Sequence, residues 1–533
     1  MASTTKVLFL AMDAGDKFLI QKWAADGTLK TFGSLLERGL VGNTMSLEGF
    51  FEGSTWPSFY TGVAPGRHGF HRLVQLKPGT YEFNACCTGE FITHPPFWSQ
   101  LSKAGRKVAV LDIPLSSITE DLGGIQMVEW GSHDPVYGFS TWPKTLKKEV
   151  LVRFGRYPVR GTCDAVGRTP SEFSVFRDHL IEGVRKKAML TKYYLSKSKW
   201  DFFAQVFTES HCVGHQCWHL HEMNHPNHSA ETVAIAGDPI RDVYVAIDEA
   251  IGEILKQIDD QTVVIILASH RMGYSYGAQF LLPDILIRLE AAQALSAEGQ
   301  SRDVRSRIDT VLTWGWKHTP VLLKHKLNPI ATRLRGKIHL PRSIAGLDFR
   351  KSRCFPLDNG LTVGGIRVNL AGREPNGMIR PGPEMDALCE YLIGELQKIT
   401  YCDTGRPAIR GVKRTAELYQ GDRLDHLPDI LVEWNDEKPL ATAGVDNAKG
   451  GMVRLFSERI GTVEGVNTYC RTGDHRPEGL FIAIGQGIEP GRLKETVSIM
   501  DFAPTFARLL GVPFPQADGR PIAEIVNPST ANP

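Results

Sequence analysis

The sequence predicts an α/β fold of three layers, in which helices cover both faces of a mainly parallel central sheet. Short apolar runs recur along the chain, and such runs are typical of strands buried on both faces. Amphipathic stretches of helical length separate them, as expected for a sheet whose crossover connections are helices. With 533 residues, 42% of them hydrophobic, the chain can build one large core with insertions.

The expected elements alternate along the chain. We predict strands over residues 7–12, 108–113, 201–208, 263–268, 430–434 and 480–484. We predict helices over residues 28–38, 97–104, 173–196, 242–259, 384–398 and 500–510. The last helix should end at Gly511-Val512-Pro513, because Gly and Pro commonly stop a helix.

One segment breaks this alternation. Residues 274–361 are rich in Lys and Arg and carry Trp314 and Trp316. We interpret the segment as an inserted cap over the site, although a solvated basic surface has the same composition. The predicted α/β core then comprises residues 1–273 and 362–526, and residues 527–533 are expected to form a flexible tail.

Composition excludes several classes of partner. Lys and Arg number 61 and Asp and Glu 59, so the net charge of +2 provides no field to hold nucleic acid or an anionic membrane. No apolar stretch approaches the ~18 residues of a membrane span. The nine cysteines include no CxxC pair and favour reduced thiols over a disulfide framework. We therefore expect a cytoplasmic protein without a membrane or nucleic-acid partner.

Polar side chains follow the predicted strands where each strand ends. Asp13 follows the first strand, His211 the third and His270 the fourth, while His475 lies just ahead of the last. Sites in open α/β sheets form beyond the carboxyl ends of the strands. His211 and His215 are four residues apart, so on a helix both imidazoles share one face and can reach one metal ion.

Thr55 precedes Pro57 by two residues, a pattern found where helices begin. Backbone N–H groups at a helix N-terminus favour anions and a negatively charged nucleophile. By itself Thr55 could equally be an ordinary N-cap residue.

Taken in order, these segments resemble the alkaline phosphatase superfamily, in particular its type I phosphodiesterase / nucleotide pyrophosphatase branch. The resemblance is carried by Asp13, Thr55-x-Pro57 with TGVAPGRHG, Gly214-His215 with Trp218, His270, and GDHR around His475. It implies an alkaline phosphatase-like sandwich and a two-metal site, usually of zinc. It implies that Asp13, Thr55 and His270 hold one metal, that His215 and His475 hold the other, and that Thr55 is the nucleophile.

Two positions depart from the family pattern. The family's Asp-His-Gly is Ser269-His270-Arg271 here, and His211 stands where the family has Asp. Two carboxylates that would screen the repulsion between two divalent ions are therefore lost. Both metals could stay, with Glu209, Ser269 or Asp474 as substitute ligands. Alternatively, His211, His215 and His475 hold one metal while Arg271 grips the substrate oxyanion, or catalysis is lost.

The sequence thus predicts a metal-dependent hydrolase of phosphate esters, phosphodiesters or related oxyanion esters. Its substrate would be a small anionic ester, and its cofactor one or two divalent transition metal ions, with zinc expected. Two alternatives stay open. One is a phosphoryl transferase or mutase of a biosynthetic pathway, and the other is a catalytically degenerate ligand-binding protein.

Overall fold

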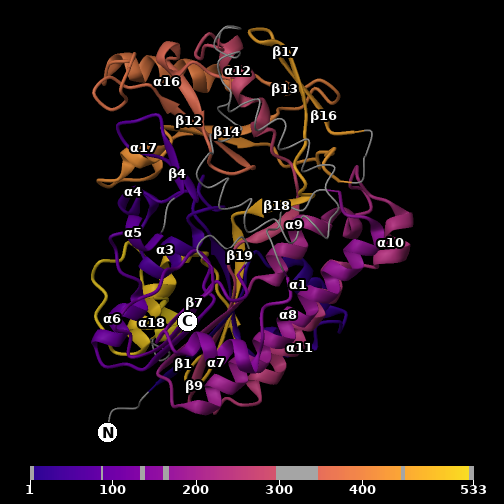
Figure 1. Ribbon diagram of the computed structural model, residues 1–533, viewed down its shortest axis with the longest axis vertical. Helices are drawn as coiled ribbons and strands as arrows, with labels where there is room; N and C mark the ends of the chain where they lie inside the picture. Colours follow the sequence, from indigo (N-terminus) through magenta and orange to yellow (C-terminus); the bar gives the residue numbers. More distant parts are fainter. Residues whose placement is uncertain are drawn as a thin grey trace. The chain divides into compact units, whose positions relative to one another are not determined.

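A computed structural model describes residues 5–85, 88–132, 138–159, 167–295, 346–445 and 450–526. The chain divides into two compact units, drawn in Figure 1. Unit 1 comprises Met1–Ala64, Thr88–Tyr274 and Arg471–Pro533, and unit 2 comprises Pro65–Cys87 and Ser275–Cys470. No helix among the described residues is both long enough and apolar enough to cross a membrane.

Unit 1 is built on a ten-stranded sheet. Its strands, in spatial order, are β20 (Gly491–Arg492), β2 (Leu40–Met45), β19 (Glu478–Ile484), β9 (Thr262–Ala268), β1 (Lys6–Met12), β8 (Phe202–Phe207), β5 (Val108–Leu111), β6 (Gly124–Val128) and β7 (Ser140–Trp142), while β21 (Val497–Ser498) also pairs with β2. The five strands from β9 to β6 run parallel. The predicted α/β class with a mainly parallel sheet is therefore confirmed.

β19 corrects one expectation, because it runs antiparallel to both β9 and β2. The reversal has a consequence for the site. Leu480, near the start of β19, pairs with Ala268 at the end of β9. The residues just ahead of β19 therefore lie at the same edge of the sheet as the residues that follow the parallel strands.

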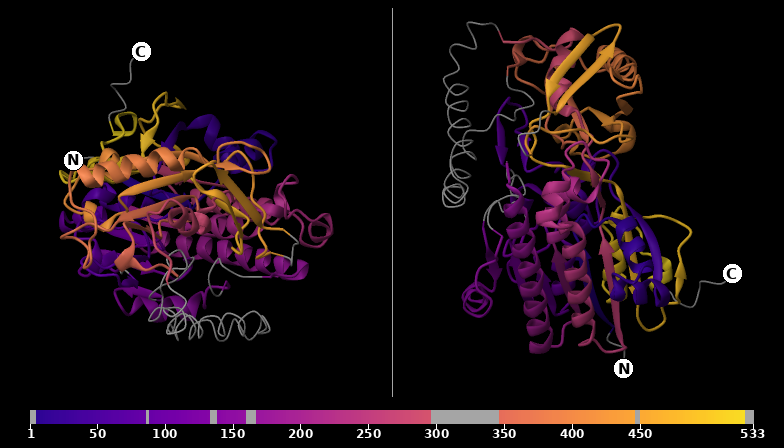
Figure 2. Two further views of the ribbon diagram at one scale, coloured as in Figure 1. Left: turned by 90° about the horizontal axis from the view of Figure 1, so that it is seen from above. Right: turned by 90° about the vertical axis from the view of Figure 1, so that its right-hand side faces the viewer.

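Two groups of helices lie on opposite sides of the strands (Figure 1). One group contains α1 (Lys17–Ala25), α2 (Lys30–Arg38), α8 (Pro170–Lys197), α9 (Glu209–His221), α10 (Ala230–Ala236) and α11 (Pro239–Leu255). The other contains α3 (Thr55–Thr61), α6 (Phe97–Lys103) and α18 (Phe502–Leu509). The long helices α8 and α11 lie side by side (Figure 2). These groups make the outer layers of the predicted three-layer sandwich.

Aromatic packing fixes α3 on the sheet. Phe59 of α3 stacks on Phe9 of β1 with ring centroids 5.0 Å apart, and Phe506 of α18 packs against both. All three rings are fully buried. Such aromatic pairs contribute about 0.5–1.5 kcal/mol beyond the area they bury. Thr55, at the start of α3, is thereby anchored to the same strand that ends at Asp13.

Unit 2 has sheets of its own. A four-stranded antiparallel sheet contains β11 (Cys354–Leu357), β12 (Val363–Val368), β15 (Ile430–Trp434) and β14 (Ile409–Arg414). A three-stranded sheet contains β13 (Thr400–Tyr401), β16 (Met452–Ser457) and β17 (Gly461–Val466), and β3 (Val74–Leu76) pairs with β4 (Phe83–Ala85). The helices include α12 (Leu282–Arg288) and α16 (Pro383–Leu396).

This division differs from the expected core and insertion. Residues 430–434 do form a strand, but β15 belongs to the antiparallel sheet of unit 2 and not to the parallel sheet. Likewise, residues 362–470 group with unit 2, because β12 hydrogen-bonds to β11 and β15. Most of the predicted cap, residues 296–345 with Trp314 and Trp316, lies outside the described residues, as does the predicted tail.

Candidate functional site

The predicted site residues converge at one edge of the unit 1 sheet. The register pairs Met12 of β1 with Phe207 of β8 and with Ala268 of β9, so these three parallel strands end together. Asp13, α9 and Ser269-His270 follow from that edge. β18 (Gly473–Arg476) pairs with β10 (Arg271–Tyr274) and places His475 opposite Met272. Antiparallel β19 is what brings His475 to this edge.

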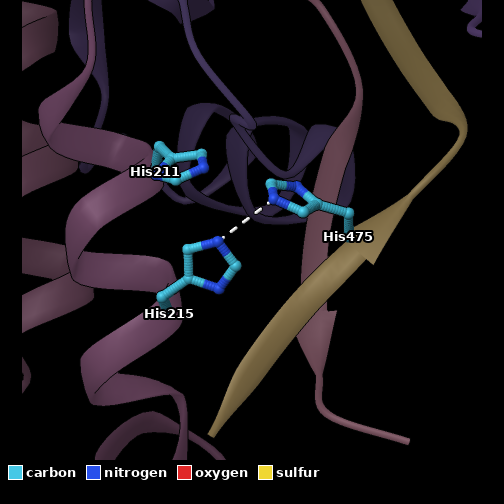
Figure 3. A group of neighbouring side chains, drawn as sticks. All are labelled: His211, His215 and His475. Atoms are coloured by element: carbon cyan, nitrogen blue, oxygen red, sulfur yellow. Dashed lines mark hydrogen bonds between the residues drawn. The ribbon is translucent and has the colours of Figure 1, made fainter. Parts of the chain in front are cut away.

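Three histidines form a buried cluster (Figure 3). His211 and His215 come from successive turns of α9 with ring centroids 4.4 Å apart, which confirms the helical spacing expected of them. The ring of His475 lies 5.0 Å and 4.7 Å from those of His211 and His215. One nitrogen of each ring lies within 4.8 Å of the others. In the described part of the chain, these three histidines are the group of three or more His, Cys, Asp or Glu side chains that could hold one metal ion together.

Hydrogen bonds assign the role of each ring nitrogen of His215. Its Nδ1 lies 2.8 Å from Gly473 O. A carbonyl oxygen only accepts, so Nδ1 carries the proton and Nε2 keeps its lone pair. That Nε2 lies 3.1 Å from Nε2 of His475. A neutral imidazole whose second nitrogen donates to a backbone carbonyl is the arrangement found in metal-binding histidines.

His270 orients His475. Its Nε2 lies 2.9 Å from Nδ1 of His475, and its own Nδ1 lies 3.0 Å from the hydroxyl oxygen of Ser269. All three side chains are buried. Since Nδ1 of His475 is taken by His270, Nε2 of His475 is the nitrogen that faces the cluster. His270 thus contacts the cluster through His475, and Ser269 contacts His270.

Asp13 connects α3 to α9. Its Oδ1 accepts a hydrogen bond of 2.8 Å from the indole of Trp56, the neighbour of Thr55. Its backbone carbonyl accepts one of 2.7 Å from the hydroxyl of Ser210, the neighbour of His211. Asp13 is 1% exposed, so these contacts are shielded from water. The start of α3 is therefore tied through one residue to the helix that carries two of the histidines.

Thr55 is also tied to the segment that carries His475. Its hydroxyl donates to Phe51 O over 2.6 Å and contacts the hydroxyl of Ser46. The backbone N–H of Ser46 donates to Pro477 O over 2.8 Å, two residues after His475. Because the χ1 angle of a β-branched residue is stiff, these contacts hold the Thr55 hydroxyl in one orientation.

Glu209 and Asp474, two of the expected substitute ligands, have other contacts. Glu209 is fully buried, and its carboxylate accepts from Tyr157 Oη at 2.7 Å and pairs with Lys187 Nζ at 3.3 Å. Both of its oxygens are thus engaged away from the cluster. Asp474 accepts from the backbone N–H of His475, and burial, with a smaller contribution from Glu52, raises its pKa to about 8. Among the described residues, neither Glu209 nor Asp474 belongs to the group of side chains close enough to share a metal ion.

Arg271, which was expected to bind the substrate oxyanion, is paired with two carboxylates of the chain instead. Its Nε donates to Glu478 over 3.0 Å, and its guanidinium lies 3.6 Å from Asp16 and over the ring of Phe18. Two carboxylates already balance its charge. Arg271 is therefore not part of the proposed catalytic group.

Sequence reasoning missed Ser46, Lys187 and Arg471. Lys187 had a detectable signal, because it falls on the apolar stripe of a predicted helix, with Leu180, Val184 and Thr191, where a lysine needs a buried partner. Arg471, whose Nη1 lies 3.2 Å from Nε2 of His215, had none in a single sequence.

Solved structures of several proteins are similar to this chain over nearly its whole length. Alkaline phosphatase PafA matches at 14% identity over 98% of each chain with a TM-score of 0.51. Phosphonoacetate hydrolase from Sinorhizobium meliloti 1021, in complex with phosphonoformate, matches at 13% identity over 96% of each chain with a TM-score of 0.47. Murine ectonucleotide pyrophosphatase / phosphodiesterase 5 matches at 11% identity over 97% of each chain with a TM-score of 0.46. No curated protein sequence matches the chain.

The likeness to PafA concerns the fold, and the family follows from the sequence. The family model described as type I phosphodiesterase / nucleotide pyrophosphatase matches residues 7–292, more than half of the chain. The matched region contains the end of β1, all of α3 and α9, and His270. This chain belongs to the type I phosphodiesterase / nucleotide pyrophosphatase family.

Proposed function

We propose that this protein hydrolyses small phosphate esters or phosphodiesters, with Thr55 as nucleophile beside one divalent transition metal ion, expected to be zinc, held by His211, His215 and His475. The observation that carries the proposal is the buried cluster of three imidazoles in a member of this family. Three neutral nitrogen donors with an open position suit a catalytic zinc site, so the residues present fit the ion.

A divalent ion bound here would act as a Lewis acid. Its charge of +2 would not be reduced by the ligands, because three imidazoles are neutral. The chain supplies the remaining parts. His270 fixes the ring of His475, and Gly473 O fixes the tautomer of His215. Both contacts lower the cost of ordering the ligand set.

Thr55 supplies the nucleophilic oxygen in this proposal. Thr55 is 1% exposed, and the contacts with Phe51 O and Ser46 orient its hydroxyl. Attack of this oxygen on phosphorus would expel the leaving alcohol and form a phosphothreonine, which water then hydrolyses. Positioning the hydroxyl through α3, Asp13 and Ser46 supplies the alignment such a displacement needs.

The test compares Thr55→Ala with Thr61→Ala in the zinc-supplemented full chain. Thr61 lies on the same helix, is buried and donates to the carbonyl four residues earlier, as Thr55 does. We expect Thr55→Ala to lower kcat on an aryl phosphate or aryl phosphodiester by a factor on the order of 10³ or more, with zinc content unchanged. Thr61→Ala should retain most activity. Similar losses in both variants, or a wild-type chain inactive on both esters, would contradict the proposal.

A further inference from the structure

Arg471 contacts the nitrogen that is proposed to bind the metal. Its Nη1 lies 3.2 Å from Nε2 of His215. A guanidinium has donors only, so it donates to the lone pair that the bond from Nδ1 to Gly473 O leaves on Nε2. Arg471 and a divalent ion therefore compete for the same lone pair.

The backbone around Arg471 is fixed on α9. Thr472 N donates to His215 O over 2.8 Å, and the Thr472 hydroxyl accepts from His219 N over 3.3 Å. At Gly473 a Cβ would lie 2.1 Å from Gly214 O, so strand and helix are in the closest contact that glycine permits. The Arg471 side chain is thus attached to a fixed backbone beside the cluster.

Arg471 is also where this segment meets solvent. Its side chain is partly exposed, while residues 472–476 are buried. A guanidinium displaced from His215 by a divalent ion would remain close, because the backbone of Thr472 and Gly473 is fixed on α9. It would then offer five N–H donors in a planar fork, which matches two phosphate oxygens.

We infer that Arg471 binds the dianionic phosphoryl group of the substrate at the metal centre, because its guanidinium lies 3.2 Å from the His215 nitrogen that is proposed to bind the ion. The inference rests on the proposed function for the metal centre, and it names the substrate class: a group with two negative charges. A second cation beside a divalent ion attracts a phosphomonoester dianion more strongly than a phosphodiester monoanion. The site is therefore biased towards monoesters.

The experiment uses the full chain as wild type, Arg471→Met, Arg471→Lys and a control, Arg454→Met. Arg454 is an exposed residue paired with Glu464, and such surface pairs have small effects. Zinc affinity of the stripped protein is measured by competition with a chromophoric chelator. Binding of inorganic phosphate to the zinc-loaded protein is measured by calorimetry.

The inference expects opposite changes in the two affinities. Arg471→Met should bind zinc about tenfold more tightly, because a competing positive charge is removed, and inorganic phosphate about tenfold or more weakly. Arg471→Lys should lie between, since it keeps the charge but not the fork. Arg454→Met should match wild type in both. Affinities unchanged in Arg471→Met, or zinc and phosphate both weakened, would overturn the inference, the second outcome assigning Arg471 to ligand ordering.

These readouts separate the inference from the proposed function, because neither requires turnover. Opposite shifts in a wild-type chain that hydrolyses no ester would support the role of Arg471 and contradict the hydrolase. An active chain in which Arg471→Met binds phosphate normally would overturn the role of Arg471 and leave the hydrolase standing. A chain that binds no zinc would contradict both.

Discussion

Single hydrogen bonds decide the chemistry of the buried histidines. Gly473 O accepts from Nδ1 of His215 and leaves Nε2 basic, and the contact of His270 with Nδ1 of His475 turns Nε2 of that ring towards the cluster. The rings of His215 and His475 are therefore each held in one orientation by a partner outside the cluster. Without these partners the rings could rotate, and metal binding would have to offset the entropy of ordering them.

Lys187 shows the same dependence on a single contact. Its ammonium is fully buried and donates to Val206 O at 3.1 Å, Thr208 Oγ1 at 3.0 Å and Glu209 at 3.3 Å. Removing one member of a buried ion pair leaves the other charge uncompensated, at a cost of about 3–5 kcal/mol. Glu209 begins α9 two residues before His211, so the loss would be felt at the site.

We predict that Lys187→Met lowers the free energy of unfolding, measured with urea, by about 3–5 kcal/mol and weakens zinc binding. The matched control is Lys192→Met on the same helix, whose pair with Glu253 is largely exposed and contributes about 0–1 kcal/mol. Equal effects of the two substitutions would show that the Lys187–Glu209 pair has no special role.

Between elements, the decisive contact is that of α9 with β18. The two histidines on the helix meet the one on the strand because glycines at residues 473 and 214 let the strands β18 and β10 approach the helix closely. A Cβ at Gly473 would lie 2.1 Å from Gly214 O, and one at Gly214 would lie 2.6 Å from Met272 Cγ. Backbone atoms cannot move aside as a flexible side chain can, so any side chain at residue 473 has to displace β18.

Gly473→Ala should therefore lower zinc affinity at least tenfold, since displacing β18 moves His475 away from α9. The measurement is chelator competition on the purified full chain. Gly394→Ala serves as the control, because a Cβ there meets no atom within 4 Å and alanine is favoured over glycine within a helix by about 0.5–1 kcal/mol. Wild-type zinc affinity in Gly473→Ala would contradict this view of the contact.

For the molecule as a whole, two buried histidines next to the site make stability depend on pH. Burial, with a smaller contribution from neighbouring histidines, lowers the pKa of His219 to about 3. Burial also lowers the pKa of His225 to about 4. Both are neutral in the folded chain, whereas a histidine in an unfolded chain titrates near pH 6.5. Below about pH 6.5 the unfolded chain binds protons that the folded chain does not.

Stability should therefore be complete above about pH 6.5 and fall by about 1.4 kcal/mol per pH unit for each of these histidines as pH is lowered towards 4. Urea unfolding of wild type and His219→Asn at pH 7.5, 6 and 5 measures the effect. The variant should have the shallower slope, because one titrating group is gone while all the others are shared. Identical slopes would mean that His219 is accessible to protons in the folded chain.

Sequence alone predicted the parallel centre of the sheet, because β1, β8 and β9 are mostly apolar runs, as strands buried on both faces usually are. Apolarity does not encode strand direction or sheet membership. That is why residues 480–484 were expected to run parallel, and why residues 430–434 were assigned to the sheet of unit 1 when they pair with β12 and β14.

The site divides along similar lines. The pairing of His211 with His215 followed from helical periodicity, and the order of the motifs led to His475. Arg271 was expected at the site because it adjoins a predicted ligand in the chain, whereas Arg471 was not considered. Which arginine contacts a histidine depends instead on how β18 packs on α9, a long-range contact that spacing along the chain does not reveal.

The most direct test of the account is the metal content per chain of the purified full-length protein, measured by elemental mass spectrometry beside His211→Ala. We predict one transition metal ion per chain in the wild type and its loss in the variant, because the proposed site uses three imidazoles as its protein ligands. His270→Ala should keep much of the metal, since His270 acts through His475. Two ions per chain, or a His211→Ala protein with undiminished metal, would contradict the three-histidine centre.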